Sequence, residues 1–203
     1  MHEDEDEEED HGHGGDAGGD PGPGRAELAR ARAELARRIR AAFAGAPYPG
    51  DDHLVATDRD YDGVRDSFAG RRSGDVTAAL VSYQYNALFF MTPAAFRYYL
   101  PAYLVAVLRG EAGDMACEFL LSRLVPPRGE RDEKYAGLVG ALDRGEREAV
   151  AAFFAHVRQV LRQEDDAGGE DSGGEDGSGP YIYSLPDVDE ALRLWRLHAA
   201  NAA

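Results

Sequence analysis

The best candidate for a binding site is a group of side chains within one apolar stretch: Arg97, Tyr98, Tyr99 and Tyr103. No other charged residue lies between Asp75 and Arg109. An isolated charge is too costly to bury, so the guanidinium must reach a carboxylate, a carbonyl or water. Asp51 or Asp52, in a turn rich in proline and glycine, is the natural partner.

Two interpretations of this arrangement stay open. In the first, an ion pair between Arg97 and Asp51 or Asp52 is a purely structural staple that ties the turn to the helix. In the second, the same pair and the tyrosine hydroxyls line a pocket or a partner surface. The candidate binding residues are then Tyr48, Asp51, Asp52, Arg97, Tyr98, Tyr99 and Tyr103.

A second pattern resembles the beginning of a calcium loop. The run from Asp58 to Gly63 has the expected acidic spacing, and Asp66 stands at the ninth position. The twelfth position should supply a bidentate glutamate, but it is Ala69. Half of the ligand set binds calcium weakly at best, so residues 58–66 are either a weak calcium site or a solvated turn.

Other patterns typical of enzymes are missing from the sequence. There is no Gly-x-Ser-x-Gly elbow and no zinc-spaced cluster of Cys and His. The lone cysteine, Cys117, lies in an apolar helical pattern and is interpreted as a core thiol. His156 is expected at the edge of an apolar helix face. We therefore predict no catalytic residue, no metal and no cofactor. Enzymatic activity stays open, although a non-enzymatic protein is favoured.

The net charge of −16 comes from two segments. Residues 1–24 carry ten acids and residues 164–180 carry seven, without a single Lys or Arg, which leaves 21 acids against 22 bases elsewhere. This balance argues against a basic nucleic-acid binder. Acidic, glycine-rich composition predicts disorder. We expect a disordered tail (1–24), a helical domain (25–163), a disordered insert (164–180) and a C-terminal helix (181–203) that packs on the same domain.

Apolar periodicity and capping patterns predict an all-α single domain of about seven helices. Thr92 and Pro93 form a strong helix start, and the apolar stretch 93–109 should be the central helix, bent by Pro101. Asp143 and Glu146 form a capping box for a later helix.

Compartment and assembly follow from composition alone. The uncharged stretch 76–96 is long enough to span a membrane, but the polar residues 82–86 and Pro93 argue against it. The first ten residues are acidic, unlike a secretory signal. Together with a single cysteine, this predicts a cytoplasmic protein, monomeric or weakly dimeric, that does not bind membranes.

Two longer motifs point to a family. They are a YPGDD turn at residues 48–52 and a TPAAFRYYLPAYL segment at residues 92–104, followed by a helix that contains Phe153 and Phe154. They resemble a bacterial family of small cytoplasmic proteins of unknown function, in which a YPGDD turn precedes a TPEAFRYYLPAYL helix. The resemblance covers about residues 35–160. It implies a shared fold, and it implies no reaction.

No specific activity follows from the sequence. The favoured hypothesis is a non-enzymatic helical module that binds another protein, a description that an immunity-like role would also fit. The acidic segments would tune solubility or reach toward a basic partner. One alternative is an enzyme or small-ligand binder that holds an anionic ligand at Arg97 and the nearby tyrosines. Another is a weak calcium binder at residues 58–66.

Overall fold

The computed structural model describes residues 23–56, 63–126, 133–167 and 184–202. Within them the chain is all-α, as predicted: it forms eight α-helices, three short 3-10 helices and no strand. The α-helices are α1 (Pro23–Ala42), α2 (Val64–Phe68), α3 (Ala78–Tyr83), α4 (Pro93–Leu108), α5 (Asp114–Leu124), α6 (Glu133–Ala141), α7 (Arg144–Ala167) and α8 (Leu185–Ala200). The 3-10 helices are η1 (Asp51–His53), η2 (Ser73–Asp75) and η3 (Ala87–Phe89).

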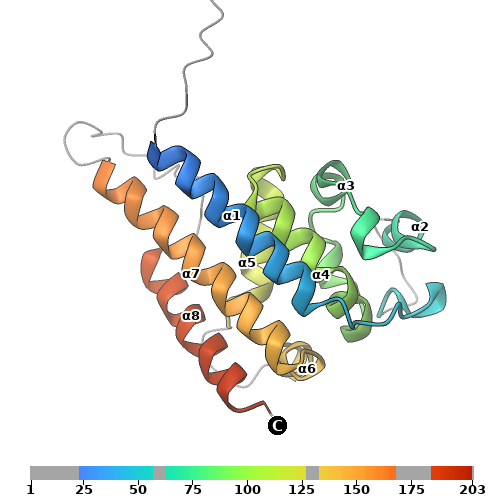
Figure 1. Cartoon of the computed structure of the whole chain (residues 1–203). Coiled ribbons are helices and arrows are strands. Elements are labelled where there is room, and N and C mark those ends of the chain that lie inside the picture. The colour runs from blue at the N-terminus through green and yellow to red at the C-terminus, as the bar shows by residue number, and fades with distance from the viewer. Residues whose placement is uncertain (1–22, 57–62, 127–132, 168–183, 203) are drawn as a thin grey trace, which may run out of the picture.

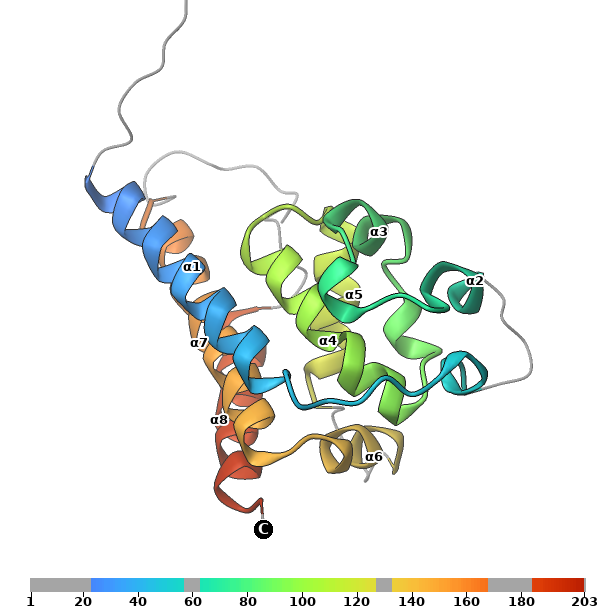
Figure 2. The same ribbon diagram turned by 45° about the vertical axis from the view of Figure 1, so that its right-hand side comes forward.

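The long helices α1, α7 and α8 run side by side and form one layer of the molecule (Figure 1). The shorter helices gather around α4 on the other side of α1, as the turned view in Figure 2 shows. Helix α1 contacts both α7 and α4, so it joins the two groups. The surface between α1 and α4, which contains a hollow described below, is therefore bounded by two helices that pack against the core.

Helix α4 is the most buried element, which confirms the central position predicted for it. Its N-cap Thr92 accepts a hydrogen bond from the backbone N–H of Ala95 at 3.2 Å, and Pro93 follows where no hydrogen bond is lost. Ten of its 16 residues are buried, including Pro101. Gly110, with a φ of 67°, follows the end of the helix. The bend expected at Pro101 stays a prediction.

The observed boundaries differ from the expected ones at the acidic segments. Helix α1 begins at Pro23, and α7 continues to Ala167. Residues 164–167 are therefore helical, whereas we had placed them in the disordered insert. Capping patterns locate helix starts well, but an acidic run without glycine or proline carries no stop signal. The rest of the predicted tail (1–22) and insert (168–180) lies outside the described residues.

Two further expectations concern the environment of the chain. None of the helices in the described ranges combines the length and the apolar character that crossing a bilayer demands. Cys117 lies on α5 and is buried, as predicted for a core thiol. Burial, followed by the charge of Asp114, raises the pKa of Cys117 to about 12, so this thiol stays protonated and unreactive near neutral pH.

A histidine links α1 to α7. The Nε of Arg32 donates a hydrogen bond to Nε2 of His156 at 3.4 Å, so this histidine is neutral in the observed contact. Burial lowers the pKa of His156 below its ordinary value of 6.5, and the charge of Arg32 lowers it further. At a pH between 6.5 and the lower pKa that His156 has in the folded protein, this histidine therefore binds a proton in the unfolded chain but not in the folded one.

This arrangement predicts a dependence of stability on pH. The free energy of unfolding should fall as the pH drops below about 6.5, because protons bind the unfolded chain more readily at this histidine. The variant His156→Gln, whose side-chain oxygen still accepts from Arg32, should lose part of that dependence. Urea unfolding at pH 7.5 and pH 5.5 measures it, and His53→Gln, at an exposed position, is the matched control. Equal pH dependence in all three proteins would contradict this prediction.

Candidate functional site

Arg97 does not pair with the acidic turn, so this expectation is wrong. Its Nε donates a hydrogen bond to Oε1 of Glu146 at 2.7 Å, and its Nη2 lies 3.2 Å from Oδ2 of Asp143. Consecutive residues of a helix point about 100° apart. The turn packs against Tyr98, one residue further along α4, and Arg97 consequently faces the start of α7.

The carboxylate of Glu146 belongs to a capping box at the start of α7. Its Oε2 accepts from the backbone N–H of Asp143 at 2.8 Å, while Oδ1 of Asp143 accepts from the N–H of Glu146 at 2.9 Å. Glu146 is fully buried, whereas Asp143 is exposed. Burial raises the pKa of Glu146, and the hydrogen bonds from Arg97 and Asp143 lower it in part. Arg97 thus neutralises the one fully buried carboxylate among the described residues.

The YPGDD turn at residues 48–52, which was expected to pair with Arg97, binds the backbone just after α2 instead. The backbone N–H of Gly70, just after α2, lies 2.9 Å from the Tyr48 hydroxyl and 2.8 Å from Oδ1 of Asp51. The hydroxyl of Tyr48 also hydrogen-bonds Asp51, which lowers the pKa of that carboxyl. Gly70 has a φ of 65°, a conformation that glycine adopts without strain. Asp52 is exposed, and Arg97 pairs with Asp143 and Glu146 instead of with this acid.

Two of the three candidate tyrosines on α4 are structural. The Tyr99 hydroxyl lies 2.9 Å from the carbonyl oxygen of Phe68 and 2.7 Å from that of Arg71. The Tyr103 hydroxyl donates to the carbonyl of Gln84 at 2.7 Å. Both rings are fully buried, and burial raises the pKa of both hydroxyls. Neither hydroxyl can therefore meet a ligand.

Tyr98 is the third candidate, and it is half-buried. Its ring meets the edge of Tyr48 at a centroid distance of 5.4 Å and that of Tyr99 at 4.9 Å. Through these contacts, the turn and the central helix do come together, although by aromatic packing and without Arg97. Tyr98 also lines a large hollow on the surface.

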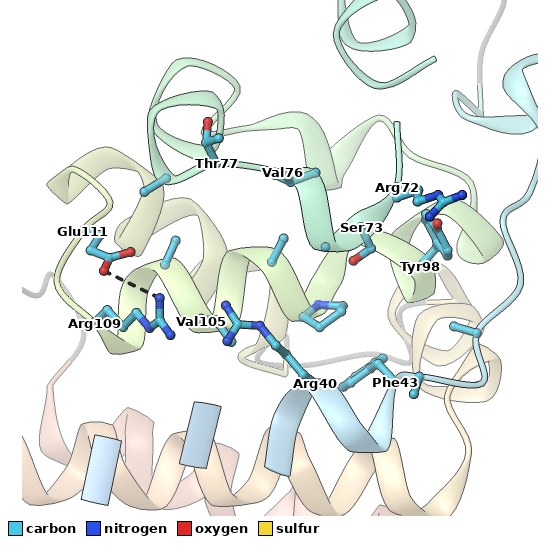
Figure 3. Close-up of a pocket in the computed structure, with 17 residues that line it drawn as sticks. Arg40, Phe43, Arg72, Ser73, Val76, Thr77, Tyr98, Val105, Arg109 and Glu111 are labelled. Carbon is cyan, nitrogen blue, oxygen red and sulfur yellow. Dashed lines mark ion pairs between the residues drawn. The ribbon is translucent and has the colours of Figure 1, made fainter. Parts of the chain in front are cut away.

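This hollow, which we call the arginine groove, has a volume of about 410 Å³ and lies between α1, η2 and α4. Three arginines line it: Arg40 on α1, Arg72 before η2 and Arg109 at the end of α4. Figure 3 shows Arg40 reaching from α1 toward α4, with Arg109 at one end of the groove and Arg72 and Tyr98 at the other. Its apolar lining includes Phe43, Val76, Pro101, Ala102, Val105 and Ala106.

The charge of the arginine groove is poorly compensated. Glu111, its single acidic lining residue, lies 3.8 Å from Nη1 of Arg109. Arg40 and Arg72 are exposed and form no ion pair with any carboxylate in the described part of the chain. Guanidinium groups bind carboxylates through two parallel hydrogen bonds. The groove therefore offers two available anion-binding groups beside an apolar surface.

A second hollow extends the arginine groove along α1. It has a volume of about 340 Å³ and shares Arg109 and Glu111 with the first. Its other lining residues come from the earlier turns of α1: Leu28, Ala29, Arg32 and Ala33. Together, the two hollows follow α1 for most of its length. Sequence reasoning missed this feature, because the chain holds 21 arginines and no local pattern distinguishes these.

The candidate calcium loop is only partly visible. Residues 58–62 lie outside the described residues, and Asp66 is exposed on α2. Among the residues that the structure describes, no group of three or more His, Cys, Asp or Glu side chains could hold a metal ion. The calcium alternative therefore stays a prediction.

Comparison with known proteins identifies a family for this chain. The model of a family of unknown function, DUF6714, matches residues 31–169. The chain therefore belongs to this family, which agrees with the expectation of a family without an assigned activity. No curated protein and no solved structure matches the chain. No specific activity follows from these comparisons.

A double-mutant cycle tests the pair of Arg97 and Glu146. Arg97→Met should lower the free energy of unfolding by about 3–5 kcal/mol, because a buried carboxylate loses its cation. The addition of Glu146→Gln, which removes that negative charge, should restore at least about 1 kcal/mol of the loss. Urea unfolding measures all four proteins. The same cycle with Asp52→Asn is the control, and coupling to Asp52 with none to Glu146 would contradict the observed pairing.

Proposed function

We propose that this member of the family is a non-enzymatic protein-interaction module that binds an acidic segment of a partner protein in the arginine groove. The observation that carries the proposal is that Arg40 and Arg72 lack a carboxylate partner in the described part of the chain. Two such arginines beside an apolar lining suit a peptide that presents carboxylates and apolar side chains together.

The shape of the site favours a peptide. The two adjoining hollows are lined by residues of α1 between Leu28 and Arg40 and by Phe43, Ala44 and Ala46 just after that helix. From Leu28 to the end of α1 at Ala42, a rise of 1.5 Å per residue gives a length of about 21 Å. Six or seven residues of extended chain span about this distance. A peptide laid along α1 would pass all of the groove arginines.

The lining residues also favour binding over catalysis. The arginine groove contains no histidine or cysteine, and its single carboxylate, Glu111, already faces Arg109. General acid–base or nucleophilic chemistry needs a titratable group free to exchange a proton with the substrate. The hydroxyls of Ser73, Thr77 and Tyr98 have no such base among the lining residues.

A small anionic ligand is the second candidate, favoured by the volume of the groove. About 410 Å³ falls within the range of about 300–1,000 Å³ that ligand pockets occupy. The anionic ligand that we had assigned to Arg97 would then bind Arg40 and Arg72, with Tyr98 beside it. Arg97 itself is engaged by Glu146 and Asp143.

We further propose a bacterial origin and a cytoplasmic location. The single cysteine of the chain is buried on α5, which suits a reducing compartment. We also propose the YPGDD turn and the TPAAFRYYLPAYL helix as the motif of the family. Their mutual packing through Tyr48 and Tyr98 supports this, because it gives both segments one structural task.

Binding of a labelled peptide tests the proposed function. The probe is an eight-residue peptide of alternating glutamate and leucine, followed by fluorescence anisotropy at low salt. Replacing both Arg40 and Arg72 by glutamine should raise the Kd about 30-fold, since each charge-assisted contact contributes on the order of 1 kcal/mol. The matched control replaces Arg38 and Arg196, two exposed arginines outside the arginine groove, with the same change in net charge.

The outcomes separate the candidates. Equal weakening by both pairs of substitutions would contradict binding in the arginine groove. If millimolar citrate binds and the peptide does not, the groove serves a small anion and the protein-interaction function is wrong. A lysine–leucine peptide of the same length can bind only the acidic segments, so replacing Arg40 and Arg72 by glutamine should not weaken its binding.

A further inference from the structure

We infer that the chain's own acidic run, residues 3–10, occupies the arginine groove and competes there with the partner segment. This inference rests on the proposed function, because it assigns a second occupant to the same surface. The charges are complementary. Residues 3–10 are eight consecutive acids, and the arginine groove is lined by three arginines and one glutamate.

Within the described ranges, no ion pair joins Arg40 or Arg72 to an acid. The acid nearest to them in the groove, Glu111, pairs with Arg109. Four acids of α1, α7 and α8 pair with arginines of their own helix or of the neighbouring helix: Glu34 with Arg37, Glu148 with Arg144, Glu190 with Arg193 and Asp189 with Arg158. Arg40 and Arg72 are thus available to bind an acidic segment from outside the described residues.

The acidic run is long enough to fill the arginine groove. Eight residues of extended chain span at most about 26–29 Å. The lining residues of α1 run from Leu28 to Arg40, a length of about 18 Å at 1.5 Å per residue. The run is therefore long enough to cover both the arginine groove and the second hollow at Leu28.

The connection between the acidic run and α1 also permits this placement. Residues 11–22 separate the run from Pro23, and six of these twelve residues are glycine. Twelve residues can reach about 40 Å when extended. Arg40 lies about 26 Å from Pro23 along the axis of α1, which is 17 residues at 1.5 Å each. Both hollows are within reach without any strain in the connection.

Covalent attachment makes even a weak contact effective. A short glycine-rich connection gives an effective concentration on the order of 1 mM. If the acidic run binds with an intrinsic Kd of about 0.1 mM, it fills the groove about nine-tenths of the time, and a partner's apparent Kd rises about tenfold. Salt weakens such a contact strongly, because it is built from exposed charges. The acidic run would act as a salt-sensitive competitive inhibitor.

The test compares variants of the full chain. In the neutral-run variant, all eight acids of residues 3–10 become their amides (E3Q/D4N/E5Q/D6N/E7Q/E8Q/E9Q/D10N). The neutral-insert variant carries E170Q/D171N/E175Q/D176N and is the control for the second acidic segment. The glutamate–leucine peptide is the probe. We expect the neutral-run variant to bind it about tenfold more tightly than the natural chain in 20 mM salt, and about equally in 500 mM salt.

The arginine substitutions separate docking from bulk charge. If the run sits on Arg40 and Arg72, its neutralisation should give no gain in a chain that also carries Arg40→Gln and Arg72→Gln. A gain that persists in that background, or an equal gain in the neutral-insert variant, would overturn the inference. So would equal affinity of the neutral-run variant and the natural chain, although binding in the groove would then stand. If no variant binds the peptide, the proposed function itself is wrong.

Discussion

The buried carboxylate of Glu146 is the constraint on which the rest of the structure depends. It lies at the first turn of α7, fully buried against α4, and a carboxylate in that position must be neutralised. Arg97, the single charge on α4, supplies the cation at 2.7 Å. This pair fixes the start of the long helix α7 on the central helix, and α7 in turn supports α1 and α8. One wall of the arginine groove is α1, so the pair also positions the groove indirectly.

This pair explains why some charged residues are structural and others are available for binding. The arginine that sequence reasoning singled out is structural, and the available arginines, Arg40 and Arg72, line a groove over the face of α4 that carries Tyr98 and Val105. The YPGDD turn and the central helix meet through the Tyr48 and Tyr98 rings, and the acid of the turn, Asp51, serves the backbone of Gly70. Both motifs therefore build the frame of the arginine groove, to which Tyr98, Pro101 and Ala102 of the second motif contribute directly.

Much of the fold could be predicted from local chemistry. The hydroxyl of Thr92 followed by a proline fixes the start of α4, and the apolar run after it requires burial. The capping box of Asp143 and Glu146 was also predictable, because it depends on residues three apart. The partner of Arg97 was not, since two acidic elements at different distances along the chain could both have supplied it. That choice depends on which face of α4 each element covers.

The arginine groove shows the same limit more clearly. Arg40, Arg72 and Arg109 are 32 and 37 residues apart along the chain, on three different elements. Nothing in their local sequence sets them apart from Arg38 or Arg196, and only the packing of α1 on α4 brings them to one hollow. The acidic run at residues 3–10 was evident from composition, but its complement on the same chain was not. The sequence alone therefore led to the expectation that the acidic segments reach toward a basic partner.

Arginine side-chain NMR tests the central claim most directly. In the natural chain, the Nε–H of Arg97 donates to a fully buried carboxylate and should exchange with water at least about tenfold more slowly than that of exposed Arg38. Glu146→Gln should speed this exchange, and Asp52→Asn should leave it unchanged. Exchange of Arg97 as fast as that of Arg38, or protection that depends on Asp52, would contradict the architecture described above.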